Sequence, residues 1–335
     1  MVAVFLLFIV FTYNFFFKGT PGYNSWTIPF PVSPVLDNAL SKSTTPDLSP
    51  DTSQRFKNVQ VIIKSGTVEL ETKLATHLKT VTSIVPLEDL FIFSDAPSKV
   101  DKHTVLDALE DLPEAYTSQY PEFETYKKQK DALLKGTILE KSGEGWKLDK
   151  HKFLPMISKT WAMQPDKEFY FFIEADTFVF WETMLSFLDG LDSAKPLYMG
   201  APIAPTIWPH PAFAYGGAGF VLSRGAMLKV LKNEHRYGAV GTHQMGMDLR
   251  DECCGDAILA DLLKSHGVLV KGYWPLFNGD DPATVPFGGG KGFWCEPFGT
   301  LHHITPKEMS RLWEWRMAHK EGVRPTKPTR RHPLC

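Results

Sequence analysis

The feature that most limits the fold of this chain is an uninterrupted apolar run, residues 169–173 (FYFFI), which leads directly into Glu174 and Asp176. A run without a polar face is typical of a strand that is buried on both sides in the centre of a sheet. Ligands of open α/β sheets bind at the carboxyl ends of the strands. Glu174 and Asp176 are therefore predicted to lie at a ligand site.

The segments around this run predict an α/β fold. Residues 58–64 (NVQVIIK) and 90–93 are expected to be strands and the stretch around residues 69–80 a helix, which together make a β-α-β opening. Residues 147–161 carry apolar side chains with a period near 3.6 residues, and an apolar-rich segment follows Asp256. Both segments are predicted helices.

Composition excludes several classes of protein. Of the 335 residues, 43% are apolar and 22% are charged, as in ordinary globular proteins and unlike collagens, disordered tails or polytopic membrane proteins. Lys plus Arg number 36 and Asp plus Glu number 38, so the formal net charge of −2 gives no electrostatic reason to expect a nucleic-acid partner. The 4 cysteines are too few for a disulfide scaffold but suffice for one bridge.

The first residues read MVAVFLLFIVFTYNFFF, with only Thr12 and Asn14 outside the apolar and aromatic set. We expect residues 1–18 to be a signal-anchor transmembrane segment, with a cleaved signal peptide or a start codon assigned too far downstream as alternatives. Residues 19–55, rich in Pro, Ser and Thr, are expected to be a stem. This layout is typical of a single-pass type II enzyme of the Golgi or another secretory-pathway membrane, with residues 56–335 forming its lumenal domain.

Carboxylates and imidazoles in two segments predict a metal site. Glu174 and Asp176, one residue apart, can both approach one divalent cation where a strand ends in a turn, although buried strands often end in acids merely because the chain returns to water. Residues 298–304 (FGTLHHI) add His302 and His303, and neutral imidazole is a good ligand for Mn²⁺-type cations. One of two adjacent histidines in a strand is expected to point away from any site. We predict Mn²⁺ or Mg²⁺ here, and leave open which histidine binds it.

Two further segments carry candidate site residues. Residues 214–224 (AYGGAGFVLSR) include Gly216 and Gly217, which allow the backbone to approach a ligand closely or to take a positive φ, and which also occur in ordinary turns. Asp256 opens a predicted helix, where it is either a site acid or a plain helix N-cap. Glu252, four residues earlier, would share a helix face with Asp256 if the helix began sooner, so it is kept as a second acid.

These segments, in this order, resemble glycosyltransferase family 31, the group that contains fringe and the core 1 galactosyltransferase of mucin O-glycans, and most closely its fungal branch. The acidic segment is similar to the D-D-D-T-Y-V block, with Asp176 at the final, metal-binding aspartate. Asp256 falls on the catalytic-base aspartate, and His302 on the matching position of the closing histidine block. The matching segments are IEADTFVF (173–180), GGAGFVLSR (216–224), VIIKSG (61–66), LFIFSD (90–95), GDAILADLLKSHGV (255–268) and TLHHI (300–304).

The resemblance implies a GT-A fold, with a mixed central sheet flanked by helices, and metal-dependent inverting transfer. The expected reaction moves a hexose or N-acetylhexosamine from a UDP-sugar to a hydroxyl of a glycan or glycoprotein, with a β-1,3 linkage and Asp256 as general base. Ser65 and Asp95 are the nucleotide contacts that the resemblance implies, together with Gly216 and Gly217. In the loops near these motifs, Trp208 and Trp274 are expected to stack on acceptor sugars, and packing beneath the loops is the alternative.

Two departures from the family pattern support a rival hypothesis. Glu174 and Ala175 occupy the first two positions of the acidic triplet, and Gly255 replaces the acid that precedes the base. The alternative is therefore a catalytically silent GT-A-like protein that binds glycans or acts as a chaperone. In an oxidising compartment, a disulfide from Cys295 to one of the adjacent pair, Cys253 and Cys254, is a further hypothesis.

Overall fold

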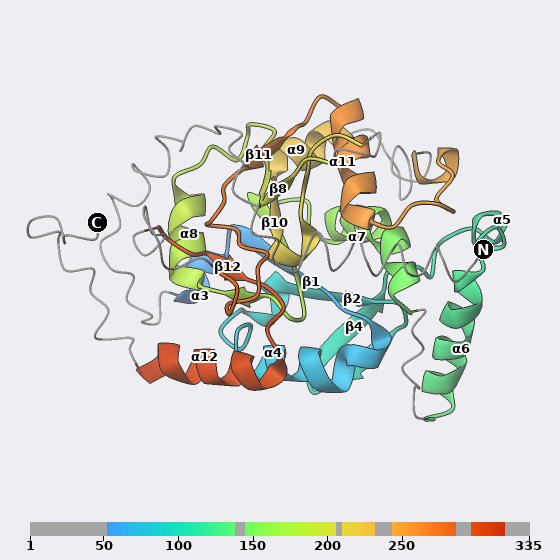
Figure 1. The fold of residues 1–335 in the computed structure, drawn as a ribbon, viewed down its shortest axis with the longest axis horizontal. Coiled ribbons are helices and arrows are strands. Elements are labelled where there is room, and N and C mark those ends of the chain that lie inside the picture. The colour runs from blue at the N-terminus through green and yellow to red at the C-terminus, as the bar shows by residue number, and fades with distance from the viewer. Residues whose placement is uncertain (1–51, 138–144, 206–209, 232–242, 286–295, 319–335) are drawn as a thin grey trace, which may run out of the picture.

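The computed structural model describes residues 52–137, 145–205, 210–231, 243–285 and 296–318 (Figure 1). Its centre is an eight-stranded mixed sheet with the order β11-β7-β10-β5-β1-β2-β4-β3. Strands β1, β2, β4 and β5 run parallel to their neighbours in this group, and β10 runs antiparallel to both β5 and β7. The strand bounds are β1 Val59–Lys64, β2 Leu90–Ser94, β3 Ser98–Val100, β4 His103–Asp107, β5 Phe169–Glu174, β7 Tyr198–Gly200, β10 Phe220–Ser223 and β11 Val270–Gly272.

Strand β5 lies between β1 and β10 and is buried on both faces, as its apolar run predicts. Successive side chains of a strand point to opposite faces of the sheet. Phe169, Phe171 and Ile173 accordingly join one hydrophobic core, and Tyr170 and Phe172 join the other. Each face therefore needs apolar residues from this strand, which explains why no polar residue interrupts it.

Helices cover both faces of the sheet, which makes the expected mixed α/β architecture. The core that contains Phe171 is closed by α3 (Thr52–Phe56), α4 (Ala75–Lys79), α8 (Trp181–Asp189) and α12 (Pro306–Ala318). The core that contains Phe172 is closed by α7 (Asp149–Met163), α9 (Arg224–Leu231) and α11 (Gly255–Ser265). Helix α12 lies alongside α4 at the lower edge of Figure 1, and α5 (Glu114–Thr117) and α6 (Glu122–Leu134) lie at the opposite end from α8.

The predicted β-α-β opening is present, but its helix is divided into three pieces. A 3-10 turn, η1 (Thr67–Glu69), is followed by a π-helical turn, η2 (Leu70–Leu74), and then by α4. Leu70 and Leu74 are buried in the core, so η2 presents its remaining side chains away from it. Single π-turns in helices are frequent at functional sites.

The expected signal-anchor and most of the expected stem lie outside the described residues. The first described helix, α3, begins at Thr52, and Phe56 at its end is fully buried against Trp181. Within the described part of the chain, no helix combines the length and the apolar character needed to cross a bilayer.

Candidate functional site

The acidic segment after β5 forms a tight turn that is joined to the glycine-rich segment. The Thr177 N–H donates to the carbonyl of Glu174 over 3.0 Å. The Thr177 hydroxyl accepts from the N–H of Glu174 over 3.1 Å and donates to the carbonyl of Gly217 over 2.9 Å. Gly217 belongs to the 3-10 turn η5 (Gly216–Ala218) that precedes β10. Thr177, which the sequence analysis did not single out, therefore fixes the acidic turn against the glycine turn.

A short strand pair brings the histidine segment to the same place. Strand β12 (Thr300–Leu301) pairs antiparallel with β6 (Phe178–Val179), and Leu301 lies opposite Phe178. The N–H of Ile304 donates to the carbonyl of Asp176 over 3.1 Å. His302 and His303 are thus held beside Asp176 by backbone hydrogen bonds on both sides.

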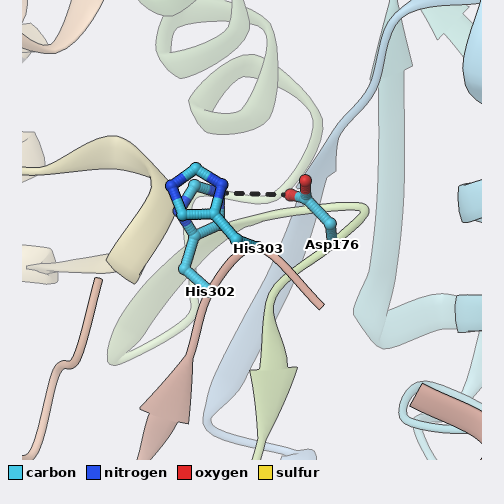
Figure 2. A group of neighbouring side chains, drawn as sticks. All are labelled: Asp176, His302 and His303. Carbon is cyan, nitrogen blue, oxygen red and sulfur yellow. Dashed lines mark ion pairs between the residues drawn. The ribbon is translucent and has the colours of Figure 1, made fainter. Parts of the chain in front are cut away.

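Asp176, His302 and His303 form a group whose potential metal-ligating atoms all lie within 4.8 Å of one another (Figure 2). Nε2 of His302 is 3.2 Å from Oδ1 of Asp176, and the centroids of the two imidazole rings are 3.9 Å apart. The prediction that one histidine points away is wrong. Strand β12 ends at Leu301 and His303 has a φ of 58°, so the alternation of a regular strand does not apply.

This group suits a divalent cation. Nε2 of the buried His302 has no partner in hydrogen-bond geometry among the described residues, and it faces Asp176. One carboxylate and two imidazoles are a common ligand set for Mn²⁺ and related cations. The hydroxyl of Tyr215 lies 3.3 Å from the other ring nitrogen of His302, Nδ1, and so orients the ring from outside the group.

Glu174, predicted as a metal ligand, lies beside the group and outside it. Its Oε1 is 3.1 Å from the ammonium of Lys64, and its Oε2 is 3.9 Å from Nε2 of His302. Lys64 and Glu174 are register partners on the parallel strands β1 and β5, so the sheet itself places this ion pair. In the sequence, Lys64 is visible only as the polar end of an apolar strand. The register of β1 and β5 shows that its partner is Glu174.

A second lysine contacts the carboxylate of Asp176. Nζ of Lys73, in η2, lies 3.0 Å from Oδ2 of Asp176. Burial by itself would raise the pKa of Asp176, but the neighbouring imidazole of His302 and the ammonium of Lys73 lower it well below the usual range. Burial by itself would lower the pKa of Lys73, and Asp176 together with Glu69 raises it. Asp176 is therefore a carboxylate at neutral pH, ready to bind a cation.

Asp256 lies in the first turn of α11 with its carboxylate aimed at the glycine turn. It is 8% exposed, and its Oδ2 accepts the N–H of Gly216 over 2.9 Å. Burial raises the pKa of Asp256 to about 6; the hydrogen bond from Gly216 opposes this rise, and the charge of Glu174 adds to it. The N-cap position of α11 is Cys254, so the plain N-cap alternative for Asp256 is wrong. A carboxylate with a pKa near 6 is suited to general-base catalysis near neutral pH.

The glycines of η5 are required by close packing against these side chains. A Cβ on Gly217 would lie 2.1 Å from Cε1 of His302, and one on Gly216 would lie 3.0 Å from Cζ of Phe153. The positive φ predicted for this segment occurs at Gly219, with a value of 77°. Glycine is therefore needed at position 217, because the ring of His302 packs directly against the backbone there and leaves no room for a side chain. Contact of Gly216 and Gly217 with a nucleotide stays a prediction.

Glu252 does not share a helix face with Asp256, because α11 begins at Gly255. Its Oε2 lies 2.8 Å from Nε2 of His210 instead. Asp261 contacts the other ring nitrogen of His210. Burial by itself would lower the pKa of His210, and the two carboxylates raise it. Glu252 therefore belongs to a cluster with His210 and Asp261. The prediction that it lies beside Asp256 on one helix face is wrong.

Ser65 and Asp95, the implied nucleotide contacts, lie at the adjoining ends of β1 and β2. Asp95 is 1% exposed, and its Oδ1 accepts the N–H of Thr67 over 2.8 Å and pairs with Nζ of Lys152 at 3.2 Å. Nζ of Lys152 also donates to the carbonyl of Ser65 over 3.2 Å. Both residues therefore shape the loop that follows β1, and their contact with a nucleotide stays a prediction.

An ion-pair network around the buried ammonium groups of Lys64 and Lys152 lies beneath this loop. Asp149, at the start of α7, has one oxygen 2.6 Å from Nζ of Lys64 and the other 2.8 Å from Nζ of Lys152. Since Lys64 and Lys152 also pair with Glu174 and Asp95, respectively, the network joins α7 to the ends of three strands. Two charged residues of this network, Asp149 and Lys152, lie in the segment KLDKHKF, whose apolar stripe alone predicted a helix.

Of the two tryptophans predicted to bind acceptor, Trp208 lies outside the described residues. Trp274 is 45% exposed and follows β11. Two residues later, the carbonyl of Leu276 accepts the N–H groups of Gly299 and Thr300 over 2.7 and 3.0 Å. The loop that carries Trp274 is thereby attached to β12, directly before His302, and stacking of Trp274 on a sugar stays a prediction.

The cysteine hypothesis is corrected by the structure. Cys253 and Cys254 form a disulfide with each other. Each sulfur takes part in one disulfide, so neither is left for Cys295, which lies outside the described residues. The disulfide directly precedes α11, which begins at Gly255.

No protein-family model and no curated protein matches the chain. Among solved structures, the chain is similar to a glycosyltransferase involved in the glycosylation of the major capsid of PBCV-1. The two are 11% identical over 76% of this chain and 99% of that one, with a TM-score of 0.34. A likeness of this size does not assign an activity, and the resemblance to glycosyltransferase family 31 stays a prediction.

Proposed function

We propose that the protein is an inverting, metal-dependent glycosyltransferase that uses a UDP-sugar donor and a glycan or glycoprotein hydroxyl as acceptor. One observation carries this proposal. A group of potential metal ligands, Asp176 with His302 and His303, lies at the carboxyl edge of the sheet, and the buried Asp256 is joined to it through adjacent glycines. Gly216 donates to Asp256, and Gly217 packs against His302.

The two halves of the site suit the two partners of a glycosyl transfer. Asp176, His302 and His303 would hold a divalent cation, which supplies positive charge for the negative charge that develops on the departing diphosphate. The carboxyl edge of the sheet is where nucleotides bind in open α/β folds. The uridine base, the sugar identity and the β-1,3 linkage rest on the sequence resemblance alone.

The role of Asp256 follows from its proton affinity. In a single displacement the acceptor oxygen forms a bond to the anomeric carbon, the bond from that carbon to the diphosphate oxygen breaks, and the diphosphate leaves with the electron pair. The acceptor hydroxyl must lose its proton in the same step, and the carboxylate of Asp256 accepts it. The N–H of Gly216 holds this carboxylate in one orientation. No covalent intermediate is required.

The proposed cellular location rests on the sequence alone. A signal-anchor over residues 1–18 and a stem over residues 19–55 would make the enzyme a single-pass type II protein of the Golgi or another secretory-pathway membrane. The lumen of these compartments is oxidising, which is compatible with the disulfide between Cys253 and Cys254.

The proposal is tested by UDP release from the purified full chain across a panel of UDP-sugars and glycan acceptors, with Mn²⁺ or with EDTA. We expect release with Mn²⁺ only, and a loss of about 10³-fold in Asp256→Asn, the size typical of removing a general base. The matched control is Asp192→Asn, because Asp192 is exposed and pairs with the exposed Lys195 rather than with a site residue.

Two outcomes distinguish the proposal from its rival. Metal-dependent release that is lost in Asp256→Asn and kept in Asp192→Asn supports the transferase. No release from any donor, with UDP binding that is indifferent to Mn²⁺, overturns it and favours the catalytically silent glycan-binding or chaperone protein.

A further inference from the structure

The cation that contacts Asp176 in the structure is Lys73. Its Nζ lies 3.0 Å from Oδ2 of Asp176 and 2.7 Å from Oε1 of Glu69. Leu70 and Leu74, on either side in η2, are buried. They anchor the π-helical turn in the core, so the backbone of Lys73 is held within reach of the carboxylate of Asp176.

Lys73 differs from the other described lysines at this edge of the sheet. The side chains of Lys64 and Lys152 are 7% and 1% exposed, and each is held between two carboxylates. The side chain of Lys73 is 34% exposed. It can therefore turn from Asp176 to a ligand in the solvent-facing part of the site, whereas the side chains of Lys64 and Lys152 are enclosed by the protein.

A divalent cation and Lys73 cannot both make close contact with Asp176 without repulsion. Oδ1 of Asp176 faces His302 and Oδ2 faces Lys73, so a cation bound to Asp176 would lie within a few ångströms of the ammonium. Like charges at that separation in a partly buried site repel strongly. The oxygens of a diphosphate relieve this repulsion, because they give the ammonium a new anionic partner.

We propose that Lys73, in addition to the divalent cation, binds the diphosphate of the donor. In the absence of donor its ammonium pairs with Asp176, and when a nucleoside diphosphate binds, the ammonium pairs with the diphosphate instead. This inference rests on the proposed function, since it assigns a residue to the same donor site. It implies opposite effects on two ligands. Removing the ammonium frees Asp176 for a metal ion, and at the same time removes a contact to the diphosphate.

The test is calorimetric titration of the full chain with Mn²⁺ alone, with UDP in EDTA, and with UDP in the presence of Mn²⁺. In Lys73→Met we expect Mn²⁺ alone to bind about threefold more tightly, and UDP in EDTA to bind about tenfold more weakly, as for the loss of one charge-assisted hydrogen bond. Lys73→Arg keeps the charge and should retain UDP binding. Lys79→Met, at an exposed position in the adjoining α4, is the matched control.

The opposite signs separate this role from a structural one. Tighter Mn²⁺ binding together with weaker UDP binding in Lys73→Met, and neither change in Lys79→Met, supports the inference. Unchanged affinities in Lys73→Met, or a fall in both, overturn it. If the unaltered chain binds no UDP with or without Mn²⁺, the proposed function itself fails, a result that is distinct because it does not involve Lys73.

Discussion

The acid-base properties of Asp256 come from where its carboxylate lies. The side chain is buried at the start of α11, where the nearby charge of Glu174 also opposes ionisation. Two backbone N–H groups, from Gly216 and Ala257, partly stabilise the charged form. The balance leaves the pKa of Asp256 at about 6, so the group is ionised at neutral pH yet retains a useful proton affinity.

This balance predicts the acidic limb of the pH profile. A general base acts in its deprotonated form, and Asp256 becomes protonated as the pH falls below its pKa of about 6. We expect kcat/KM for UDP-sugar transfer to be level above pH 7 and to fall about tenfold for each pH unit below 6. Initial rates between pH 4.5 and 8 measure this limb. A profile that stays level down to pH 4.5 would assign the proton transfer to a group other than Asp256.

At the scale of elements, the glycine turn η5 joins the two halves of the site. Its Gly216 N–H holds the carboxylate of Asp256, its Gly217 carbonyl accepts the hydroxyl of Thr177, and the face of Gly217 supports the ring of His302. One turn of backbone therefore determines where Asp256, the acidic turn and His302 lie relative to one another.

Gly217→Ala should for this reason damage the metal group first. The added Cβ would lie 2.1 Å from Cε1 of His302, so the ring has to move away from Asp176. We expect Mn²⁺ affinity, measured by calorimetry, to fall about tenfold or more, the size seen when groups that orient metal ligands are lost. Gly246→Ala is the control, because a Cβ there meets nothing within 4 Å. Equal Mn²⁺ affinity in the two variants would show that His302 is not a ligand.

Across the whole molecule, an ion-pair network around the buried ammonium groups of Lys64 and Lys152 holds α7 against the carboxyl ends of β1, β2 and β5. Lys152 is its most deeply buried cation and pairs with Asp149 and Asp95, while Lys64 pairs with Asp149 and Glu174. Burial by itself would lower the pKa of Lys152, and its two carboxylates raise it. The site residues therefore lie on a charged layer that is itself part of the fold.

Removing one charge from this layer should destabilise the fold. In Lys152→Met the free energy of unfolding, measured with urea, should fall by about 3 kcal/mol, because the buried carboxylate of Asp95 loses its partner. Lys128→Met, at an exposed position in α6, should leave it within about 0.5 kcal/mol. If the network matters as a unit, adding Asp95→Asn to Lys152→Met should restore part of the loss. Additive losses in the double variant would contradict this coupling.

The main elements of the fold and the residue types of the site could be predicted from local segments of the chain. The run at residues 169–173 predicted a central buried strand, the β-α-β opening and the helix after Asp256 were correct, and the pairing of Asp176 with a histidine followed from the chemistry of metal ligation. These inferences succeeded because apolar periodicity and ligand chemistry are local properties that a short segment expresses on its own.

Which of these residues come into contact depends on how the whole chain folds. The register of β1 and β5 pairs Lys64 with Glu174, and the π-helical turn brings Lys73 to Asp176. Because β12 ends before them, both His302 and His303 can lie beside Asp176. The later start of α11 placed Glu252 beside His210. Contacts of this kind depend on strand register, helix ends and single backbone angles, which are set by the packing of the whole chain and leave no periodic signal in any one segment.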